Sequence, residues 1–245
     1  MKKYFPLFWV FYLLCAFSAH AGEGRYTIPL TGGGWSLWLD KEASWQNDRL
    51  YLPHEITDLS LLPVNVPTGG WQTLSHNPDA VPVEVPGTVE EYLTVTDNPR
   101  PENFRGVSWW YRKITIPADQ QKKRFIINFE SVRMRAEVYL DGKLVAYDLI
   151  GETPFHVDIT DEAKPGKEQL LAIRVTNPGG NFHWQDFDIM KWGEYNIPPS
   201  RSFTGIIGRV KLESVNPVFI SDIYMQNTPE LTKVNAILSF TNETS

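Results

Sequence analysis

The stretch MRAEVYLDGKLVAYD, residues 134–148, decides the fold class. Its first half has apolar side chains at every second position: Met134, Ala136, Val138 and Leu140. This period of two is that of a β-strand with one buried face. Asp141-Gly142 then precedes a second apolar run, and an Asp-Gly pair there favours a tight hairpin because both turn positions require a positive φ. The stretch therefore predicts two antiparallel strands.

The same alternation recurs before and after this hairpin. Apolar residues define one face of each run: Trp110, Ile114 and Ile116; Phe125, Ile127 and Phe129; Phe155, Val157 and Ile159; Leu171, Ile173 and Val175. Beyond the N-terminal segment nothing sustains a helical period for three turns, and the best helix candidates are single turns such as residues 88–93. Many short half-buried strands separated by Gly and Pro predict an all-β fold, a β-sandwich or jelly roll.

Two features indicate a layer that covers this sandwich. Residues 45–106 are rich in proline and turn residues, which predicts loops laid over the strands. Trp109 and Trp110 are consecutive in a predicted strand, so alternation sends one side chain inward and the other outward. We expect one of them in the core and the other as a covering aromatic residue.

The N-terminal segment has the layout of a secretory signal peptide. Two lysines precede an unbroken apolar run, and a small-x-small motif that ends at Ala21 follows the run directly. We therefore predict a signal peptide over residues 1–21, export to the periplasm or the cell exterior, and no membrane contact after cleavage. An uncleaved anchor is the alternative, but the run is short for a span of roughly 20 residues. A lipoprotein attached through Cys15 is disfavoured because Leu14 before it is bulky.

Cysteine content and charge limit the chemistry of the mature chain. Cys15 is the only cysteine, so neither a disulfide nor a thiolate metal site is available after cleavage. The formal charge of -6 becomes -8 when the signal peptide, with two lysines and no acidic residue, is removed. An acidic chain without basic clusters binds nucleic acid poorly, because that affinity depends on phosphate neutralisation. Neutral solutes such as sugars are the expected partners.

Residues 217–245 are predicted to begin a second domain. Their last run alternates apolar residues with polar ones: Val234, Ala236, Leu238 and Phe240. Pro217 and a turn at residues 227–230 separate this strand from the preceding ones. An edge strand of the preceding sheet is the alternative. We favour a second, truncated domain, which leaves residues 22–216 as the first.

The segment GGNFHWQDFDIMKWGEYNIPPS, residues 179–200, has no strand or helix period and is rich in aromatic and acidic residues. Trp184 and Trp192 can present aromatic faces to the C–H patches of a pyranose, and carboxylates such as Asp186 and Asp188 accept hydrogen bonds from its hydroxyl groups. A loop closed over the sandwich by its own aromatic residues is the alternative interpretation. The two aspartates could equally be cation ligands or solvated groups rather than the catalytic pair of a glycosidase.

No catalytic constellation is visible in the sequence. The histidines lack metal-ligand spacing: His54, His76, His156 and His183. Serines occur without a G-x-S-x-G motif, and the glycine clusters lack a phosphate-loop pattern. The sequence therefore predicts no resident metal and no cofactor.

Several spaced motifs carry a resemblance to a known family. They are GVSWWYRKITIP at residues 106–117, FIINFESVRMRAEVYLDGKLVAY at residues 125–147 and FTGIIGRVKL at residues 203–212. In this order they resemble the N-terminal sugar-binding jelly roll of glycoside hydrolase family 2, which contains β-galactosidases, β-glucuronidases and β-mannosidases. The resemblance covers about residues 103–213 and implies a jelly-roll β-sandwich like that of galactose-binding domains. The tail from Pro217 resembles the start of the immunoglobulin-like β-sandwich that follows in the family.

The same resemblance implies where sugar contacts lie. In β-galactosidases of the family an asparagine and an aspartate of the jelly roll reach the active site, and Asn103 matches the first. Asp186 or Asp188, before Trp192, matches the second, and which of the two corresponds stays open. Some β-galactosidases hold a sodium ion at that aspartate, so the resemblance leaves a sodium ion beside Asp186 or Asp188 as a minor alternative to the absence of a cofactor.

These observations lead to one principal hypothesis and two rivals. Both catalytic glutamates of the family lie on a C-terminal (β/α)₈ barrel that this sequence lacks. We therefore expect the N-terminal, non-catalytic portion of an exported glycosidase that acts on β-glycosides, inactive without the barrel as its partner. The rivals are a stand-alone secreted carbohydrate-binding module and a purely structural domain. The identity of the sugar is left open, because fold alone does not decide it.

Overall fold

The computed structural model describes residues 24–43, 59, 62–93, 104, 106–148, 151, 153–177 and 203–244. The predicted signal peptide, residues 1–21, lies outside these ranges. Within them, no helix is both long and apolar enough to span a membrane.

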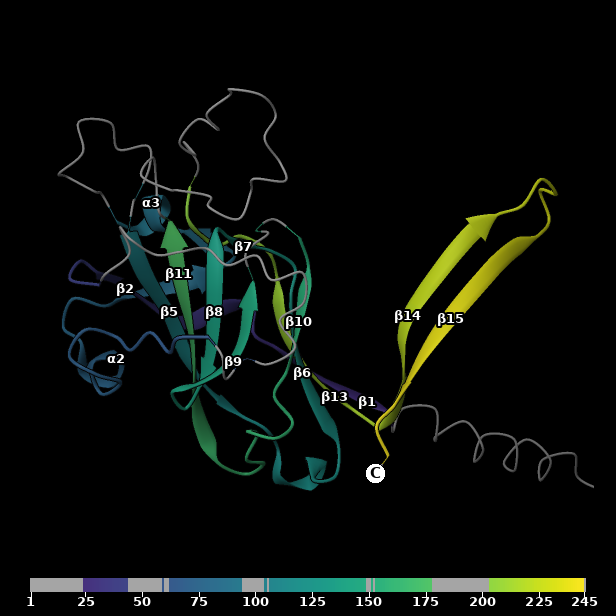
Figure 1. The fold of residues 1–245 in the computed structure, drawn as a ribbon, viewed down its shortest axis with the longest axis horizontal. Coiled ribbons are helices and arrows are strands. Elements are labelled where there is room, and N and C mark those ends of the chain that lie inside the picture. The colour runs from purple at the N-terminus through teal and green to yellow at the C-terminus, as the bar shows by residue number, and fades with distance from the viewer. Residues whose placement is uncertain are drawn as a thin grey trace, which may run out of the picture.

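Two antiparallel sheets build the sandwich (Figure 1). The six-stranded sheet has the order β3-β2-β5-β11-β8-β9, with the respective bounds Val81–Val85, Gly32–Asp40, Gly106–Thr115, Glu168–Asn177, Arg135–Leu140 and Lys143–Asp148. The four-stranded sheet has the order β1-β13-β6-β10, with the bounds Arg25–Pro29, Val210–Val215, Arg124–Phe129 and Phe155–Asp158. The expected all-β sandwich is confirmed.

One apolar core fills the space between these sheets. The six-stranded sheet contributes residues such as Trp110, Ile114, Val138, Leu171, Ile173 and Val175, and the four-stranded sheet contributes Phe125, Ile127, Phe129, Val157 and Leu212. These are the faces that the alternation predicted. Burial of apolar area at about 25 cal/mol per Å² is the main favourable term for such a core.

The predicted hairpin joins β8 and β9. Asp141 has φ 48° and Gly142 has φ 83°, the positive values that a tight two-residue turn requires. A Cβ atom at Gly142 would lie 3.0 Å from the indole nitrogen of Trp71. Glycine is therefore needed at this position both for the turn and for the close approach of the tryptophan.

Short elements close one end of the sandwich. A three-stranded sheet has the order β4-β12-β7, with the bounds Gly87–Thr88, Gly205–Ile206 and Val132–Arg133. The single-turn helix α3, Val89–Tyr92, follows β4, and the Thr88 hydroxyl caps it by accepting from the Glu91 N–H at 3.1 Å. The helical turn expected at residues 88–93 is confirmed. The other helical turns are α2, Thr73–His76, and η2, Ala118–Gln120.

The outer face of the six-stranded sheet is covered as well. Trp109 points to this face, the opposite side from Trp110, and both side chains are fully buried. Trp71 from the covering segment packs edge-on against Trp109 with ring centroids 5.7 Å apart. Leu74 joins the same cluster. The prediction of loops over the sandwich is thus confirmed for residues 62–80.

The hairpin of β14, Val218–Asn227, and β15, Val234–Asn242, projects from the sandwich (Figure 1). Among the described residues β15 pairs only with β14, so the alternative of an edge strand on the preceding sheet is wrong. Apolar side chains are exposed along the hairpin: Val218, Ile220, Ile223, Tyr224, Met225, Val234, Ile237, Leu238 and Phe240. Arg124 of β6 forms an ion pair with Glu243, just after β15, at 3.4 Å.

Neighbouring isoleucines on β6 test the core assignment. Ile127→Ala should lower the free energy of unfolding by about 2–5 kcal/mol, because it opens a cavity in the core. Ile126→Ala, the same change on the half-buried face of the strand, should have less than half that effect. Urea unfolding followed by tryptophan fluorescence measures both. Equal losses would contradict the assignment of the two faces.

Candidate functional site

The predicted sugar-contacting residues lie outside the described ranges: Asn103, Trp184, Asp186, Asp188 and Trp192. The structure does describe the residues that flank them. Phe104 follows Asn103, while Asn177 and Phe203 are the nearest described residues before and after the aromatic segment. The position of these flanking residues decides whether the two predicted contact segments start from the same place.

A polar cluster, here named the loop anchor, holds these flanking positions together: Glu90, Phe104, Asn177 and Thr204. The Glu90 carboxylate accepts hydrogen bonds from the N–H of Phe104 at 2.8 Å and of Thr204 at 3.1 Å. The Asn177 side-chain amide donates to the Phe104 carbonyl at 2.7 Å and to the Thr204 hydroxyl at 2.8 Å. Asn177 and Thr204 are fully buried, so water does not compete for these bonds.

The fold brings the loop anchor to one end of the six-stranded sheet. Asn177 is the last residue of β11, where that strand pairs with the beginning of β5. Glu90 lies on α3, and the α3 residue Tyr92 packs edge-on against Trp110 with centroids 6.5 Å apart. Thr204 directly precedes β12, which pairs with β4. The predicted contact segments on either side therefore begin at a single, packed end of the sandwich.

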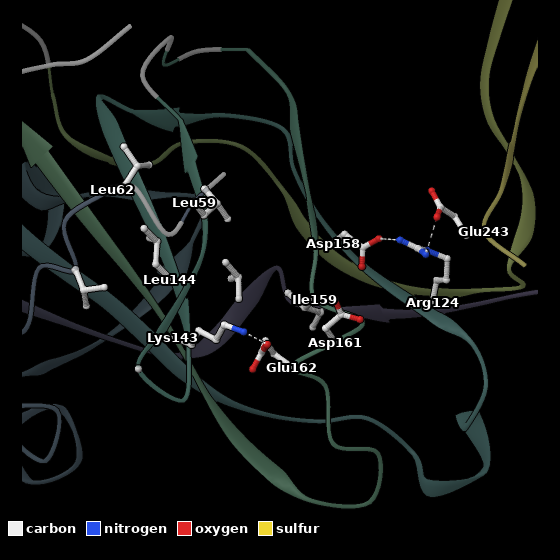
Figure 2. A pocket seen from close by; sticks show the side chains of 13 residues that line it. Leu59, Leu62, Arg124, Lys143, Leu144, Asp158, Ile159, Asp161, Glu162 and Glu243 are labelled. Carbon is white, nitrogen blue, oxygen red and sulfur yellow. Dashed lines mark hydrogen bonds and ion pairs between the residues drawn. The ribbon is translucent and has the colours of Figure 1, made fainter. Parts of the chain in front are cut away.

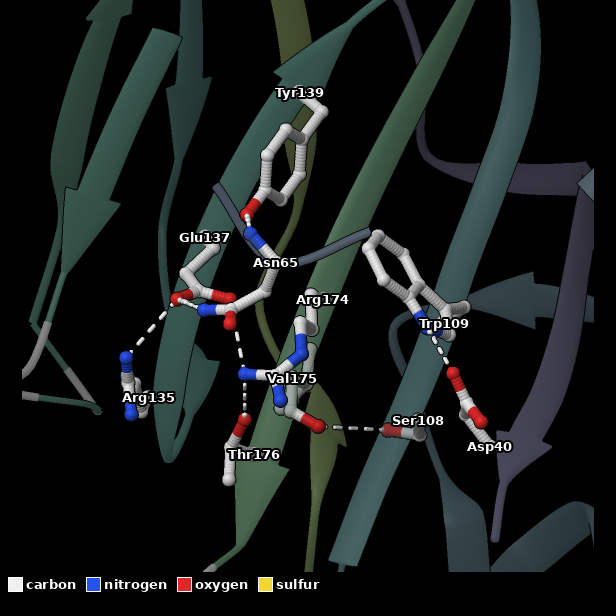
Figure 3. A network of polar contacts seen from close by, with 10 residues as sticks. All are labelled: Asp40, Asn65, Ser108, Trp109, Arg135, Glu137, Tyr139, Arg174, Val175 and Thr176. Carbon is white, nitrogen blue, oxygen red and sulfur yellow. Dashed lines mark hydrogen bonds and ion pairs between the residues drawn. The ribbon is translucent and has the colours of Figure 1, made fainter. Parts of the chain in front are cut away.

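A second polar cluster lies under the covering segment (Figure 3). The Glu137 carboxylate accepts hydrogen bonds from Arg135 at 3.0 Å and from Asn65 at 2.6 Å through one oxygen, and from Arg174 at 3.0 Å through the other. Arg174 also donates to the Thr176 hydroxyl at 3.0 Å. The side chains of Glu137, Arg135 and Arg174 are nearly inaccessible to solvent. We name these residues the outer-face network.

The outer-face network joins the covering segment to the sheet. The Asn65 N–H donates to the Tyr139 hydroxyl at 3.1 Å, and burial together with the Glu137 charge raises the pKa of Tyr139. Asp40 makes a parallel link, since one carboxylate oxygen accepts from Thr68 N–H at 2.9 Å and from the Trp109 indole at 3.2 Å. Glu137 is occupied at both oxygens and out of reach of a substrate, so its role is structural rather than that of an acid or base.

A groove of about 1090 Å³ opens beside the turn between β8 and β9 and is lined by Gly142 and Lys143 among others (Figure 2). Two groups of ion pairs line it, Lys143 with Glu162 and Arg124 with both Asp158 and Glu243. Its apolar wall consists of aliphatic residues: Leu59, Leu62, Val64, Leu144, Val145 and Ile159. None of the described lining residues is aromatic, so the groove lacks the stacking surface that a pyranose favours.

Metal binding finds no support in the described part of the chain. Within those ranges no group of three or more His, Cys, Asp and Glu residues is placed to hold an ion. Asp186 and Asp188, the residues of the minor sodium alternative, lie outside these ranges.

The sequence analysis did not identify the loop anchor or the outer-face network. For Glu137 and Arg174 a signal existed, because the neighbouring outward positions Tyr139 and Ala172 are apolar, and a charge among them indicates a covered face. For Glu90, in the run VEEYL, the sequence offers no feature that distinguishes it from the exposed Glu91.

Comparison with known proteins identifies a family and several relatives. The family model for "Glycosyl hydrolases family 2, sugar binding domain" matches residues 32–197. A β-glucuronidase of Formosa agariphila is 31% identical over 118 residues, which is 48% of this chain and 12% of that protein. A β-galactosidase of Thermoanaerobacter pseudethanolicus is 32% identical over 124 residues, which is 50% of this chain and 16% of that protein. The matched part thus spans less than a fifth of either relative.

Solved structures resemble this chain over most of its length. A β-glucuronidase of Ruminococcus gnavus superposes with a TM-score of 0.62 at 19% identity, over 91% of this chain and 34% of that chain. A β-glucuronidase of an uncultured Clostridium superposes with a TM-score of 0.60 at 20% identity, over 99% of this chain and 36% of that chain. Likeness at these identities establishes a shared fold.

Removing one charge from the outer-face network tests its structural role. Glu137→Gln should lower the free energy of unfolding by about 3–5 kcal/mol, because it removes the carboxylate charge that pairs with two buried guanidinium groups. Glu168→Gln is the matched control: its ion pair with Lys113, at 2.7 Å, is exposed, so the loss should stay below about 1 kcal/mol. Urea denaturation compares the two, and a Glu137→Gln loss no larger than that of the control would refute the role.

Proposed function

Since the chain belongs to glycoside hydrolase family 2, we propose that it is the N-terminal, non-catalytic portion of an exported β-glycosidase. In this role the jelly roll, residues 22–216, supports a catalytic (β/α)₈ barrel elsewhere in the protein and contributes contacts to the sugar. The predicted signal peptide at residues 1–21 delivers the protein to the periplasm or the cell exterior. We propose no cofactor for this role, with a sodium ion beside Asp186 or Asp188 as the minor alternative.

The loop anchor is the observation that carries this proposal. It places Phe104, next to Asn103, in hydrogen-bonded contact with the same two side chains that hold Thr204. A sugar pocket built from two segments far apart in sequence requires such a common origin. The groove beside β9 has ion pairs and aliphatic walls in place of aromatic faces, and so supports a carbohydrate role less well.

Each predicted contact residue has chemistry suited to one part of a sugar. Trp184 and Trp192 offer faces for the apolar side of a pyranose. The amide of Asn103 both donates and accepts hydrogen bonds, whereas the carboxylate of Asp186 or Asp188 accepts from hydroxyl groups. In a retaining glycosidase the bond is cleaved by two carboxyl groups about 5–5.5 Å apart, which we assign to the barrel. We therefore expect residues 22–245 alone to leave glycosides intact.

The β14–β15 hairpin fits the start of a second domain, residues 217–245. An isolated two-stranded hairpin is at best marginally stable in water, and a contiguous exposed apolar surface usually marks an interaction site. We therefore expect further strands to pack against the apolar residues that are exposed along this hairpin. We propose that they begin an immunoglobulin-like β-sandwich between the jelly roll and the barrel.

Hydrolysis of chromogenic β-glycosides by the complete reading frame that contains this chain tests the proposal. The relatives divide between β-glucuronidase and β-galactosidase, so both 4-nitrophenyl β-glucuronide and 4-nitrophenyl β-galactoside serve as substrates. We expect turnover of at least one by the complete protein and of neither by residues 22–245. Turnover by residues 22–245 would contradict the proposal, and a reading frame that ends at Ser245 while the chain binds sugar would favour the stand-alone module.

Alanine variants of the complete protein test the sugar contacts. Asp186→Ala or Asp188→Ala should lower kcat/KM about 10- to 100-fold, because a hydrogen bond to a charged group contributes about 1.5–3 kcal/mol. Asp161→Ala, at an exposed position beside the groove, is the control and should leave kcat/KM unchanged. Unchanged turnover in both test variants would support a purely structural domain instead.

A further inference from the structure

We propose that Glu90 and Asn177 are positioning residues, which fix the two sugar-contacting segments relative to each other through Phe104 and Thr204. The inference rests on the proposed function but assigns a role to residues that do not touch the sugar. Its basis is that the side chains of Glu90 and Asn177 together make four hydrogen bonds to Phe104 and Thr204, which are 100 residues apart in the numbering: three to backbone groups and one to the Thr204 hydroxyl.

The loop anchor leaves each of these positions little freedom. Both backbone polar groups of Phe104 are engaged, the N–H with Glu90 and the carbonyl with Asn177. The N–H, the hydroxyl and the carbonyl of Thr204 are all engaged, the last by the Val89 N–H at 2.7 Å. The N–H of Phe104 lies in the rigid peptide plane that joins it to the preceding residue. The Glu90 bond therefore restricts the direction in which the chain approaches Phe104.

The chemistry of the two side chains suits this task. Glu90 uses two acceptor oxygens for two N–H donors, and a glutamine would present one acceptor and one NH₂ group instead. Asn177 uses one NH₂ group for two oxygen acceptors, and an aspartate would place an oxygen against the Phe104 carbonyl, which cannot donate a hydrogen bond. Hydrogen bonds to a carboxylate are among the stronger ones in proteins. Near-isosteric replacements at either position thus disrupt the loop anchor without removing volume.

The loop anchor is separable from the core of the sandwich. Glu90 is only half-buried, and α3 retains its cap at Thr88 and its contact between Tyr92 and Trp110 without it. Glu91, the next residue, has an exposed side chain on the same helical turn. Glu91→Gln is therefore the control: it makes the same Glu-to-Gln change, with the same loss of one negative charge, at a residue outside the loop anchor.

Steady-state kinetics of the complete enzyme on 4-nitrophenyl β-glucuronide and 4-nitrophenyl β-galactoside provide the test. For the substrate turned over, Glu90→Gln and Asn177→Asp should each lower kcat/KM about tenfold or more, whereas Glu91→Gln should match the wild type. In an Asn103→Ala background the effect of Glu90→Gln on kcat/KM should be smaller than in the wild type, because the part transmitted through Phe104 to Asn103 is lost while the part transmitted through Thr204 remains. If Glu90→Gln only reduced the amount of folded protein, it would lower kcat/KM by the same factor in the wild-type and the Asn103→Ala backgrounds.

Amide hydrogen exchange on residues 22–245 adds a readout that needs no turnover. In Glu90→Gln the amides of Phe104 and Thr204 should exchange faster together, and in Glu91→Gln neither should change. Faster exchange with unchanged kcat/KM would overturn the positioning role while leaving the proposed function in place. The positioning role would also be overturned if Glu90→Gln lowered kcat/KM by the same factor in the wild-type and the Asn103→Ala backgrounds. Absence of turnover in the wild-type enzyme would overturn the proposed function, and the positioning role with it.

Discussion

Burial on both faces of the central strands β5 and β11 is the constraint on which the rest of the structure depends. One face packs against the four-stranded sheet through Trp110, and the other lies under residues 62–80 through Trp109. A strand in this position has no solvent to satisfy its polar side chains, so each must find a partner within the protein. Glu137 and Arg174 meet this requirement with each other and with their neighbours.

The same constraint makes the end of the sheet a firm support for loops. Because β11 is held by strands on both sides and by a layer on each face, its last residue, Asn177, has a fixed position. Its amide and the Glu90 carboxylate then hold backbone groups from two other parts of the chain. Loops that contribute to a ligand pocket need such a rigid support.

The β14–β15 hairpin, unlike the central strands, is not buried. Its strands pair with each other, and their apolar side chains remain exposed in the described part of the chain. It meets the sandwich through polar contacts, among them the ion pair of Arg124 with Glu243 and the hydrogen bond from Arg25 to the Ile220 carbonyl. The contrast between the covered six-stranded sheet and the exposed hairpin is the physical basis for our proposal of a domain boundary near Pro217.

The sequence by itself determined the features that depend on neighbouring residues. The alternation from Met134 to Leu140 and the Asp141-Gly142 turn specified a hairpin, because side-chain period and turn conformation are local properties. Resemblance to the family added the expected sugar contacts. Only the tertiary structure decided that Trp109 is buried and that Glu90 meets Thr204, 114 residues away. The contact between Glu90 and Thr204 follows from which strands become neighbours, and no local pattern encodes that choice.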